Sequence, residues 1–292
     1  MKIAITTDSN AGILPTEVED TNIFVLPMPF LIDGEEYFEN INLTQDEFFE
    51  KQIAGANIST SQPSIYSVTS LWKEVLEKYD YVIHIPMSSS LSSSVETAIM
   101  LSKEDEFAGK VFVVDNQRIS VTQKQSVYDA QKMAAAGKTV QEIYDYLTET
   151  KTENSIYIMV PDLKYLKKGG RITKAAAMIG TLLKIKPVLQ IQGGKLDSYA
   201  KALTVKKAKE VMIGAIKKDL QARFLEFLEK GQINISVAYT YDKNLALEFK
   251  QEIEQEIPNI KINWIDPLSL SVSCHIGPNA VAVAISSVYS EK

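Results

Sequence analysis

The sequence predicts an α/β protein with two domains, residues 1–153 and residues 154–292. Its 292 residues favour two domains over one. Through the first domain, short apolar runs of strand length alternate with longer helical patterns. This alternation is typical of a mostly parallel sheet with helices on both faces. In such sheets, ligands bind beyond the carboxyl ends of the strands.

The first domain is expected to begin with a strand and to alternate from there. Its expected strands lie at 2–6, 23–32, 35–38, 81–85 and 111–115, and its expected helices begin at or after Thr44, Ser64, Ser93, Ser120 and Thr139. Asp33-Gly34 favours a hairpin turn. Thr44 and Thr139 each precede a Glu by three residues, which is the spacing of a capping box at a helix start.

The second domain is expected to form another α/β layer. Its expected strands lie at 155–160, 185–191, 196–200, 233–239, 262–265 and 281–285, and its expected helices at 162–168, 204–227 and 244–257. Gly193-Gly194 should close a hairpin. The stretch 172–183 is apolar and rich in small residues, and we expect a helix there as well.

The composition argues against several classes of protein. No apolar run reaches the roughly 18–20 residues that cross a bilayer, and the first residues become polar too soon for a secretory signal. The single cysteine, Cys274, excludes an internal disulfide framework and suits a reducing cytoplasm. Two histidines and one cysteine argue against a zinc site, so we expect no metal and no cofactor.

The net charge of −6 conceals a division along the chain. Residues 164–218 contain 14 Lys or Arg and two acids, a net charge of +12, which leaves −18 for the remainder. Such asymmetry indicates a face that meets an anionic surface or an acidic partner. Ordinary solvated helix faces would explain it equally well.

The most distinctive stretch is a serine-rich turn, Pro86-Met87-Ser88-Ser89-Ser90-Leu91-Ser92-Ser93-Ser94-Val95-Glu96. It joins the apolar run 81–85 to an expected helix. The free N–H groups at a helix start favour a carboxylate or phosphate, and serine hydroxyls add donors. Ser93 and Glu96 also have capping-box spacing, so part of the turn could simply cap a helix. The turn alone leaves both interpretations open.

Two more polar stretches are expected near the same edge of the sheet. Asp8 follows the first strand, and Asn10 stands where an aspartyl-phosphate phosphatase needs a second acid. We therefore favour turn chemistry at Asp8, or support of the serine-rich turn, over phosphoryl transfer. Thr60 and Ser61 lie in a polar loop before Pro63 and could equally face solvent.

Near the end of the sequence, Gly277-Pro278 marks a turn and predicts that His275 lies on a loop. Cys274 and His275 would point to opposite sides of an extended chain, which disfavours a catalytic pair. A charged His275 could instead donate two hydrogen bonds to an anion. The other histidine, His84, lies in a strand-like run and is expected in the core.

In order and spacing, these motifs resemble those of the DegV family of bacterial fatty-acid-binding proteins. The matching stretches are spread over nearly the whole chain: Thr7-Asp8-Ser9, Thr60-Ser61-Gln62-Pro63, Ser88 to Ser94, Leu166 to Ile172, and His275-Ile276-Gly277-Pro278. The sequence departs from the family pattern at Ser90 and Ser93, where glycine is usual, at Val95, often an aromatic, and at Asn279, where a second glycine is common.

The resemblance implies a DegV-like fold that encloses one long-chain fatty acid at the domain interface, with the tail in an apolar tunnel. The carboxylate-binding residues, carried over by motif position, would be Thr60, Ser61, Ser92, Ser93 and His275. Such a carrier is not itself an enzyme. It presents its ligand to an ATP-dependent fatty acid kinase, which forms acyl-phosphate for phospholipid metabolism. We further expect a cytoplasmic protein whose Lys167, Lys168 and Arg171 touch an anionic membrane transiently.

The alternative from another class is a serine acyl hydrolase that uses a loop serine with His275. Against it, no Gly-x-Ser-x-Gly elbow occurs in the sequence. A nucleotide-binding module would need a glycine-rich phosphate loop, and neither common pattern is present. The overall acidity and the lack of a recognised motif argue against nucleic acid as a partner.

Overall fold

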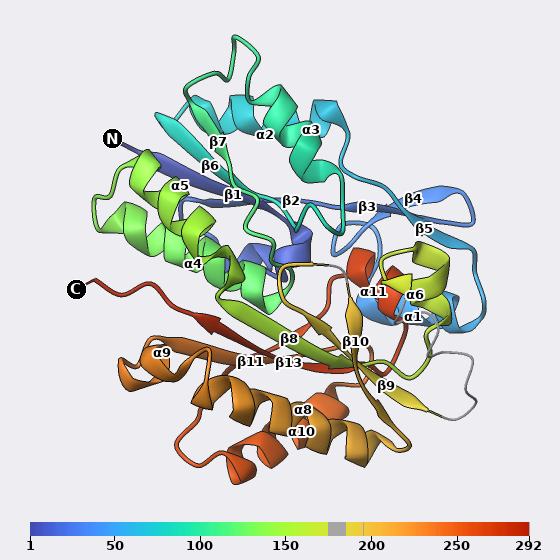
Figure 1. The fold of residues 1–292 in the computed structure, drawn as a ribbon. Coiled ribbons are helices and arrows are strands. Elements are labelled where there is room, and N and C mark those ends of the chain that lie inside the picture. Colours follow the sequence, from blue (N-terminus) through green and yellow to red (C-terminus); the bar gives the residue numbers. More distant parts are fainter. Residues whose placement is uncertain (175–184, 195, 292) are drawn as a thin grey trace.

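The computed structural model describes residues 1–174, 185–194 and 196–291 (Figure 1). Its first sheet is parallel, as predicted, in the order β2-β1-β6-β7. These strands are β1 (Ile3–Asp8), β2 (Ile23–Leu26), β6 (Tyr81–Ile85) and β7 (Val111–Val113). α2 (Ile65–Leu76) and α3 (Ser94–Leu101) cover one face, and α4 (Val121–Ala135) and α5 (Val140–Glu149) cover the other. The chain is thus α/β, with helices on both faces of this sheet.

A second, six-stranded sheet is mostly antiparallel. Its order is β10 (Asp197–Ala202), β9 (Lys186–Ile191), β8 (Asn154–Met159), β13 (Val281–Ser287), β11 (Ile233–Tyr239) and β12 (Ile262–Pro267). Only β11 and β12 pair in parallel. α8 (Val205–Gln221) and α10 (Lys243–Glu256) pack on one face. The other face contacts α4, which therefore lies between the two large sheets.

A third, small sheet contains the hairpin predicted at Asp33-Gly34, which is confirmed, and one further strand that was not predicted. β3 (Pro29–Ile32), β4 (Glu35–Phe38) and β5 (Ile58–Thr60) pair antiparallel in the order β4-β3-β5. It packs with α1 (Gln45–Ile53) and α11 (Leu270–Ile276), and α11 in turn packs on α6 (Lys164–Gly169). The single strand expected at 23–32 is wrong. Its residues are divided between two sheets around Pro27, which has no N–H to continue a ladder.

Capping side chains explain where several of the described helices begin. Thr44, Ser64 and Thr139 cap their helices by accepting from backbone N–H groups, as predicted. Ser93 precedes α3, but its side chain makes no capping hydrogen bond, so that capping box is wrong. The helix expected at 204–227 is divided into α8 and α9 (Leu225–Glu229). The helix expected at 172–183 lies mostly outside the described residues.

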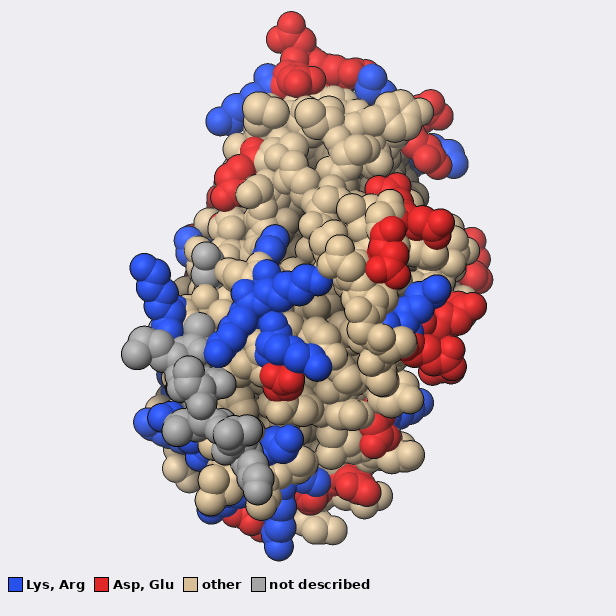
Figure 2. Space-filling view, turned by 90° about the vertical axis from the view of Figure 1, so that its right-hand side faces the viewer, with Lys and Arg blue, Asp and Glu red and all other residues tan. Residues whose placement is uncertain are grey.

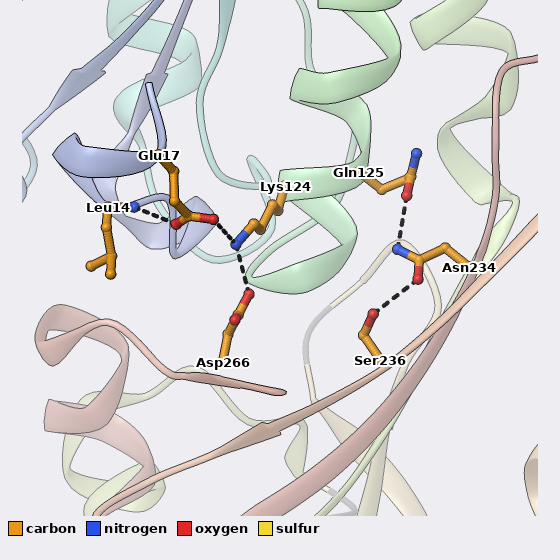
Figure 3. Close-up of polar contacts among 7 residues, drawn as sticks. All are labelled: Leu14, Glu17, Lys124, Gln125, Asn234, Ser236 and Asp266. Carbon is orange, nitrogen blue, oxygen red and sulfur yellow. Dashed lines mark hydrogen bonds and ion pairs between the residues drawn. The ribbon is translucent and has the colours of Figure 1, made fainter. Parts of the chain in front are cut away.

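Buried polar contacts join the two halves of the chain (Figure 3). The Lys124 side chain on α4 is 2% exposed and donates to Glu17 at 2.7 Å and to Asp266 of β12 at 2.9 Å. One residue further on, Gln125 Oε1 accepts from Asn234 Nδ2 of β11 at 2.8 Å. Polar groups this deeply buried hold a defined geometry, so the two large sheets are fixed relative to each other.

Candidate ligand-binding site

A cavity lies where the first sheet, the small sheet and α11 meet. Residues from both halves of the sequence line it. The centre of a water-sized sphere can move within about 70 Å³ of this cavity. The polar side chains in its wall are Thr60, Ser61, Gln62, Ser92, Arg171, Ser271 and His275. Four of the five predicted carboxylate-binding residues therefore surround one space. The fifth, Ser93, is exposed and is not part of this wall.

The central contact of this cavity joins Thr60, at the end of β5, to His275. Thr60 Oγ1 and His275 Nε2 are 2.9 Å apart, although 215 positions separate them in the sequence. Thr60 is thus not a solvent-facing loop residue, because the pairing of β5 with β3 directs this end of the strand into the cavity. If the Nε2–H of His275 donates to Thr60 Oγ1, the hydroxyl keeps its own proton and can donate it to an acceptor placed between the domains.

His275 lies in helix α11, so its predicted loop location is wrong. The turn at Gly277-Pro278 follows the helix directly, and Ser269 caps the helix start. Burial, with a smaller effect from the Arg171 guanidinium, lowers the pKa of His275 to about 4. The ring is neutral near pH 7 and donates from one nitrogen only, not from two. Its neighbour Cys274 is buried, and burial raises the pKa of the thiol, which disfavours a thiolate nucleophile.

The serine-rich turn is held by its own hydroxyls and by Asp115. Ser89 Oγ donates to Asp115 Oδ2 at 2.6 Å, while Ser88 Oγ and Ser92 Oγ accept from the N–H groups of Ser90 and Ser94 at 3.2 Å. A hydroxyl that accepts from a backbone N–H still has a proton to donate. Ser92 can therefore support the turn and also offer a donor to the cavity that it lines.

The Asp8 carboxylate accepts hydrogen bonds that support the serine-rich turn. This confirms the role that the sequence favoured for Asp8. Its Oδ2 accepts from Met87 N at 2.7 Å, and its Oδ1 accepts from Asn10 N at 3.0 Å and from Gln123 Nε2 at 3.2 Å. Burial outweighs these hydrogen bonds and raises the pKa of Asp8 to about 6. His84 is a core residue, as predicted: it is 2% exposed, and burial lowers its pKa to about 3.

A second, apolar cavity adjoins the first. The two share Ile119, Leu196, Val272 and Ile276 as wall residues. In the second cavity the centre of a water-sized sphere can move within about 40 Å³. This cavity runs along the face of the six-stranded sheet that contacts α4, beside Ala238, Ala282 and Ala284. Nearly all of its wall is apolar. The pair of cavities is therefore polar at one end and apolar at the other.

Lysines and arginines gather on the surface next to this site. Lys164, Lys167, Lys168 and Lys174 are exposed on α6 and just after it, and Figure 2 shows such a basic cluster on this side of the molecule, with acidic groups towards the upper end and one edge. Lys168 Nζ donates to Asn57 Oδ1 at 2.8 Å. Arg171, predicted to be a surface contact, is half-buried, lines the polar cavity and donates to the carbonyls of Gly169 and Leu91.

Several residues of the site could not be recognised in the sequence. Gly169 predicted a helix end, but it also admits the His275 ring, because a Cβ at Gly169 would overlap that ring. Gly277 accommodates Tyr165 in the same way. Met28 and Met87 line the polar cavity, although nothing in the sequence distinguishes them from core methionines. The glycines at 169 and 277 gave a signal in the sequence, as a helix end and a turn, whereas the two methionines gave none.

Within 1–174, 185–194 and 196–291, no group of three His, Cys, Asp or Glu side chains could hold a metal ion. None of the helices in this part of the chain is long and apolar enough to cross a membrane.

Fold and site together define a two-domain α/β protein with a polar and an apolar cavity side by side at the domain contact. Residues 2–288 match the profile of a family described as "Uncharacterised protein, DegV family". A DegV domain-containing protein of Streptococcus pyogenes serotype M6 is 30% identical over 289 residues, covering 98% of this chain and 99% of the relative. The chain therefore belongs to the DegV family.

Solved structures agree with this assignment. A fatty acid binding DegV family protein from Thermus thermophilus is 27% identical, with a TM-score of 0.87 over 99% of this chain and 100% of that one. DegV from Bacillus subtilis, a fatty acid binding protein, is 26% identical, with a TM-score of 0.82 over 98% of this chain and 99% of that one. The predicted DegV-like fold is confirmed.

Proposed function

We propose that this chain is a carrier for one long-chain fatty acid. Its carboxylate would be held by Thr60, Ser92 and His275, with Ser61 beside them, and its tail would occupy the apolar cavity. The observation that supports this most directly is the Thr60–His275 hydrogen bond in a polar cavity whose walls continue into an apolar one. Ser93 makes no contact that supports the role expected of it.

The chemistry of the two cavities suits such a ligand. A buried carboxylate is costly unless donors surround it, and the polar wall supplies hydroxyls, an imidazole and a guanidinium. Burial of a sixteen-carbon tail at about 0.8 kcal/mol per CH₂ is worth on the order of 10 kcal/mol. The described cavities are narrow, so we expect side chains in their walls to move aside on loading. Because the ligand binds the folded state, the loaded protein should be the more stable form.

We further propose that the carrier presents its ligand to an ATP-dependent fatty acid kinase, which would form acyl-phosphate for phospholipid metabolism. This role places the chain in the cytoplasm. The carrier would contribute no catalytic group of its own. The basic cluster around Lys167 and Lys168 beside the cavity suits an approach to the anionic surface of a membrane, from which a fatty acid is collected.

The geometry gives little support to a serine acyl hydrolase. The hydroxyl bonded to His275 Nε2 belongs to Thr60 and not to a loop serine. On the Nδ1 side the ring packs against Gly169, and His275 has a pKa near 4, which makes it a weak base. Ester hydrolysis that disappears in His275→Ala would favour the hydrolase over the carrier.

Mass spectrometry of the purified protein tests the proposal. The native protein should carry a mass increment that solvent extraction releases as one fatty acid per chain. Tail length and unsaturation would follow from the same measurement. A protein that is empty, and that also fails to take up added oleate or palmitate, would contradict the carrier function.

A further inference from the structure

Asn10 is a fully buried amide between the two parts of the polar site. Its Oδ1 accepts from Ser269 Oγ at 2.9 Å and from Ser271 Oγ at 2.5 Å, at the start of α11. Its Nδ2 lies 2.9 Å from Met87 Sδ, in the serine-rich turn. The same residue therefore contacts the turn that carries Ser92 and the helix that carries His275.

The backbone of Asn10 is fixed as well. Asp8 Oδ1 accepts from Asn10 N, and the other oxygen of the same carboxylate accepts from Met87 N. The Asn10 carbonyl accepts from Ser120 N at 3.0 Å, next to the apolar cavity that Ser120 lines. Asp8 and Asn10 thus tie the serine-rich turn, α11 and the start of α4 to the end of β1.

We propose that Asn10 is a positioning residue for the carboxylate site. It fixes α11, and with it His275, at a set distance from the serine-rich turn. Ser271 and His275 are four residues apart, one helical turn, so the amide contacts the turn of α11 that precedes the imidazole. An amide suits this place because its oxygen accepts from two hydroxyls while its nitrogen donates. This inference rests on the proposed function.

The chain offers a matched control at the same domain contact. Gln125 is also a buried amide, and its Oε1 accepts from Asn234 Nδ2 across the contact (Figure 3). Neither Gln125 nor Asn234 lines either cavity. A substitution at Gln125 therefore removes a buried interdomain hydrogen bond without reaching the carboxylate site.

The experiment compares dissociation constants for oleate and oleyl alcohol, which share a tail and differ in the head group. The wild-type chain should prefer oleate. In Asn10→Ala, the ratio of the dissociation constant for oleyl alcohol to that for oleate should fall about ten- to a hundredfold. This is the range expected for one hydrogen bond to a charged group. Gln125→Ala should keep the wild-type preference. Equal weakening for both ligands in Asn10→Ala, or an unchanged preference, would overturn the positioning role.

A second variant approaches the same contact from α11. Ser269 donates to Asn10 and also caps α11, and it is not part of either cavity wall. Glycine at a helix cap costs only a few tenths of a kcal/mol, so Ser269→Gly removes the hydroxyl that Asn10 accepts with little loss of capping, and it should also reduce the oleate preference. If Asn10→Ala does not fold, this variant decides the question by the same criterion. A wild-type chain that binds neither ligand would refute the carrier function itself, which separates that failure from a failure of the Asn10 proposal.

Discussion

The imidazole of His275 packs directly against Gly169, so closely that a methyl group there would overlap the ring. The same pair of helices has a second contact of this kind, where the Tyr165 ring covers Gly277. α6 and α11 thus approach each other through two glycines. Because His275 bonds Thr60 from this position, the α6–α11 contact sets the geometry of the polar cavity.

Gly169→Ala should therefore weaken fatty acid binding. The added methyl displaces His275 and breaks its contact with Thr60, and overpacking of this kind costs about 1–3 kcal/mol of stability. We expect the dissociation constant for oleate to rise at least about tenfold, one hydrogen bond to a charged group being worth that much. Gly194→Ala is the control, because its Cβ would meet nothing within 4 Å and its φ is not positive. Equal oleate affinities of Gly169→Ala and Gly194→Ala would contradict a role of the Gly169–His275 contact in binding.

Acid should destabilise the free protein partly through His275. Its pKa is about 4 in the folded chain against 6.5 for an unperturbed histidine. Between pH 6.5 and 4 the unfolded state binds more protons, so the free energy of unfolding falls as the pH falls. His275→Gln removes this effect, and relative to it the wild type should lose up to about 3 kcal/mol by pH 4.

The comparison of the two proteins is needed because Asp8 acts in the opposite direction. Its pKa is raised from 3.8 to about 6, so the folded state holds that proton, and the contribution of Asp8 to stability falls as the pH rises through this window. Both proteins contain Asp8, and the difference between their denaturation curves isolates His275. If the free energies of unfolding of the wild type and His275→Gln differ by a constant amount from pH 7 to pH 4, the His275 ring has the same pKa in the folded and unfolded chain, which would contradict this prediction.

The resemblance to the DegV family predicted, by motif position, that Thr60, Ser61, Ser92 and His275 would share one site, and all four line one cavity. That they bind a carboxylate stays a prediction. Local structure around two of them was misjudged. The polar stretch around Thr60 resembles a loop, but β5 exists through its pairing with β3, about thirty residues earlier. Gly277-Pro278 does mark a turn, but a short capped helix precedes it.

Asn10 shows why the remainder of the site could not be predicted. Its partner Ser269 lies 259 positions away, and no local pattern indicates that a turn asparagine will meet a helix start across the domain contact. The same holds for Lys124, a lysine inside a helix whose partners Glu17 and Asp266 come from opposite ends of the chain. Such contacts depend on how the sheets pack, which the periodicity of a single sequence does not encode.

Lys124→Met should destabilise the protein. The substitution leaves Glu17 and Asp266 facing each other without a cation (Figure 3), and breaking a buried ion pair from one side costs about 3–5 kcal/mol. We expect the low end, because the Glu17 side chain is 33% exposed. Adding Asp266→Asn should recover part of the loss by removing an unpaired charge. Chemical denaturation measures both, and a double variant less stable than Lys124→Met would contradict this account.

The basic cluster should control binding to anionic membranes. Lys167→Glu with Lys168→Glu should weaken binding to phosphatidylglycerol vesicles, since each lysine near such a surface is worth about 1 kcal/mol. Binding to phosphatidylcholine vesicles should not change. The control is Lys206→Glu with Lys218→Glu, which changes the net charge by the same amount. Both lysines are exposed and lie on α8, within the basic stretch 164–218 but away from α6. Sedimentation with vesicles at low and high salt measures the effect. Equal losses in the two double variants would indicate a general charge effect and no docking face.

Ala284→Val should shift the preferred ligand towards shorter tails. Ala284 is 3% exposed on β13 and lines the apolar cavity, so two added methyl groups occupy space that a tail would need. The ratio of laurate to palmitate affinity should therefore rise, while the carboxylate contacts stay the same. Ala215→Val adds the same volume to the core on the other face of the sheet and controls for overpacking. Competition between the two acids, read by mass spectrometry of the extracted ligand, measures the ratio. An unchanged ratio in Ala284→Val would place the tail elsewhere, because a tail lying against β13 must meet the added methyl groups.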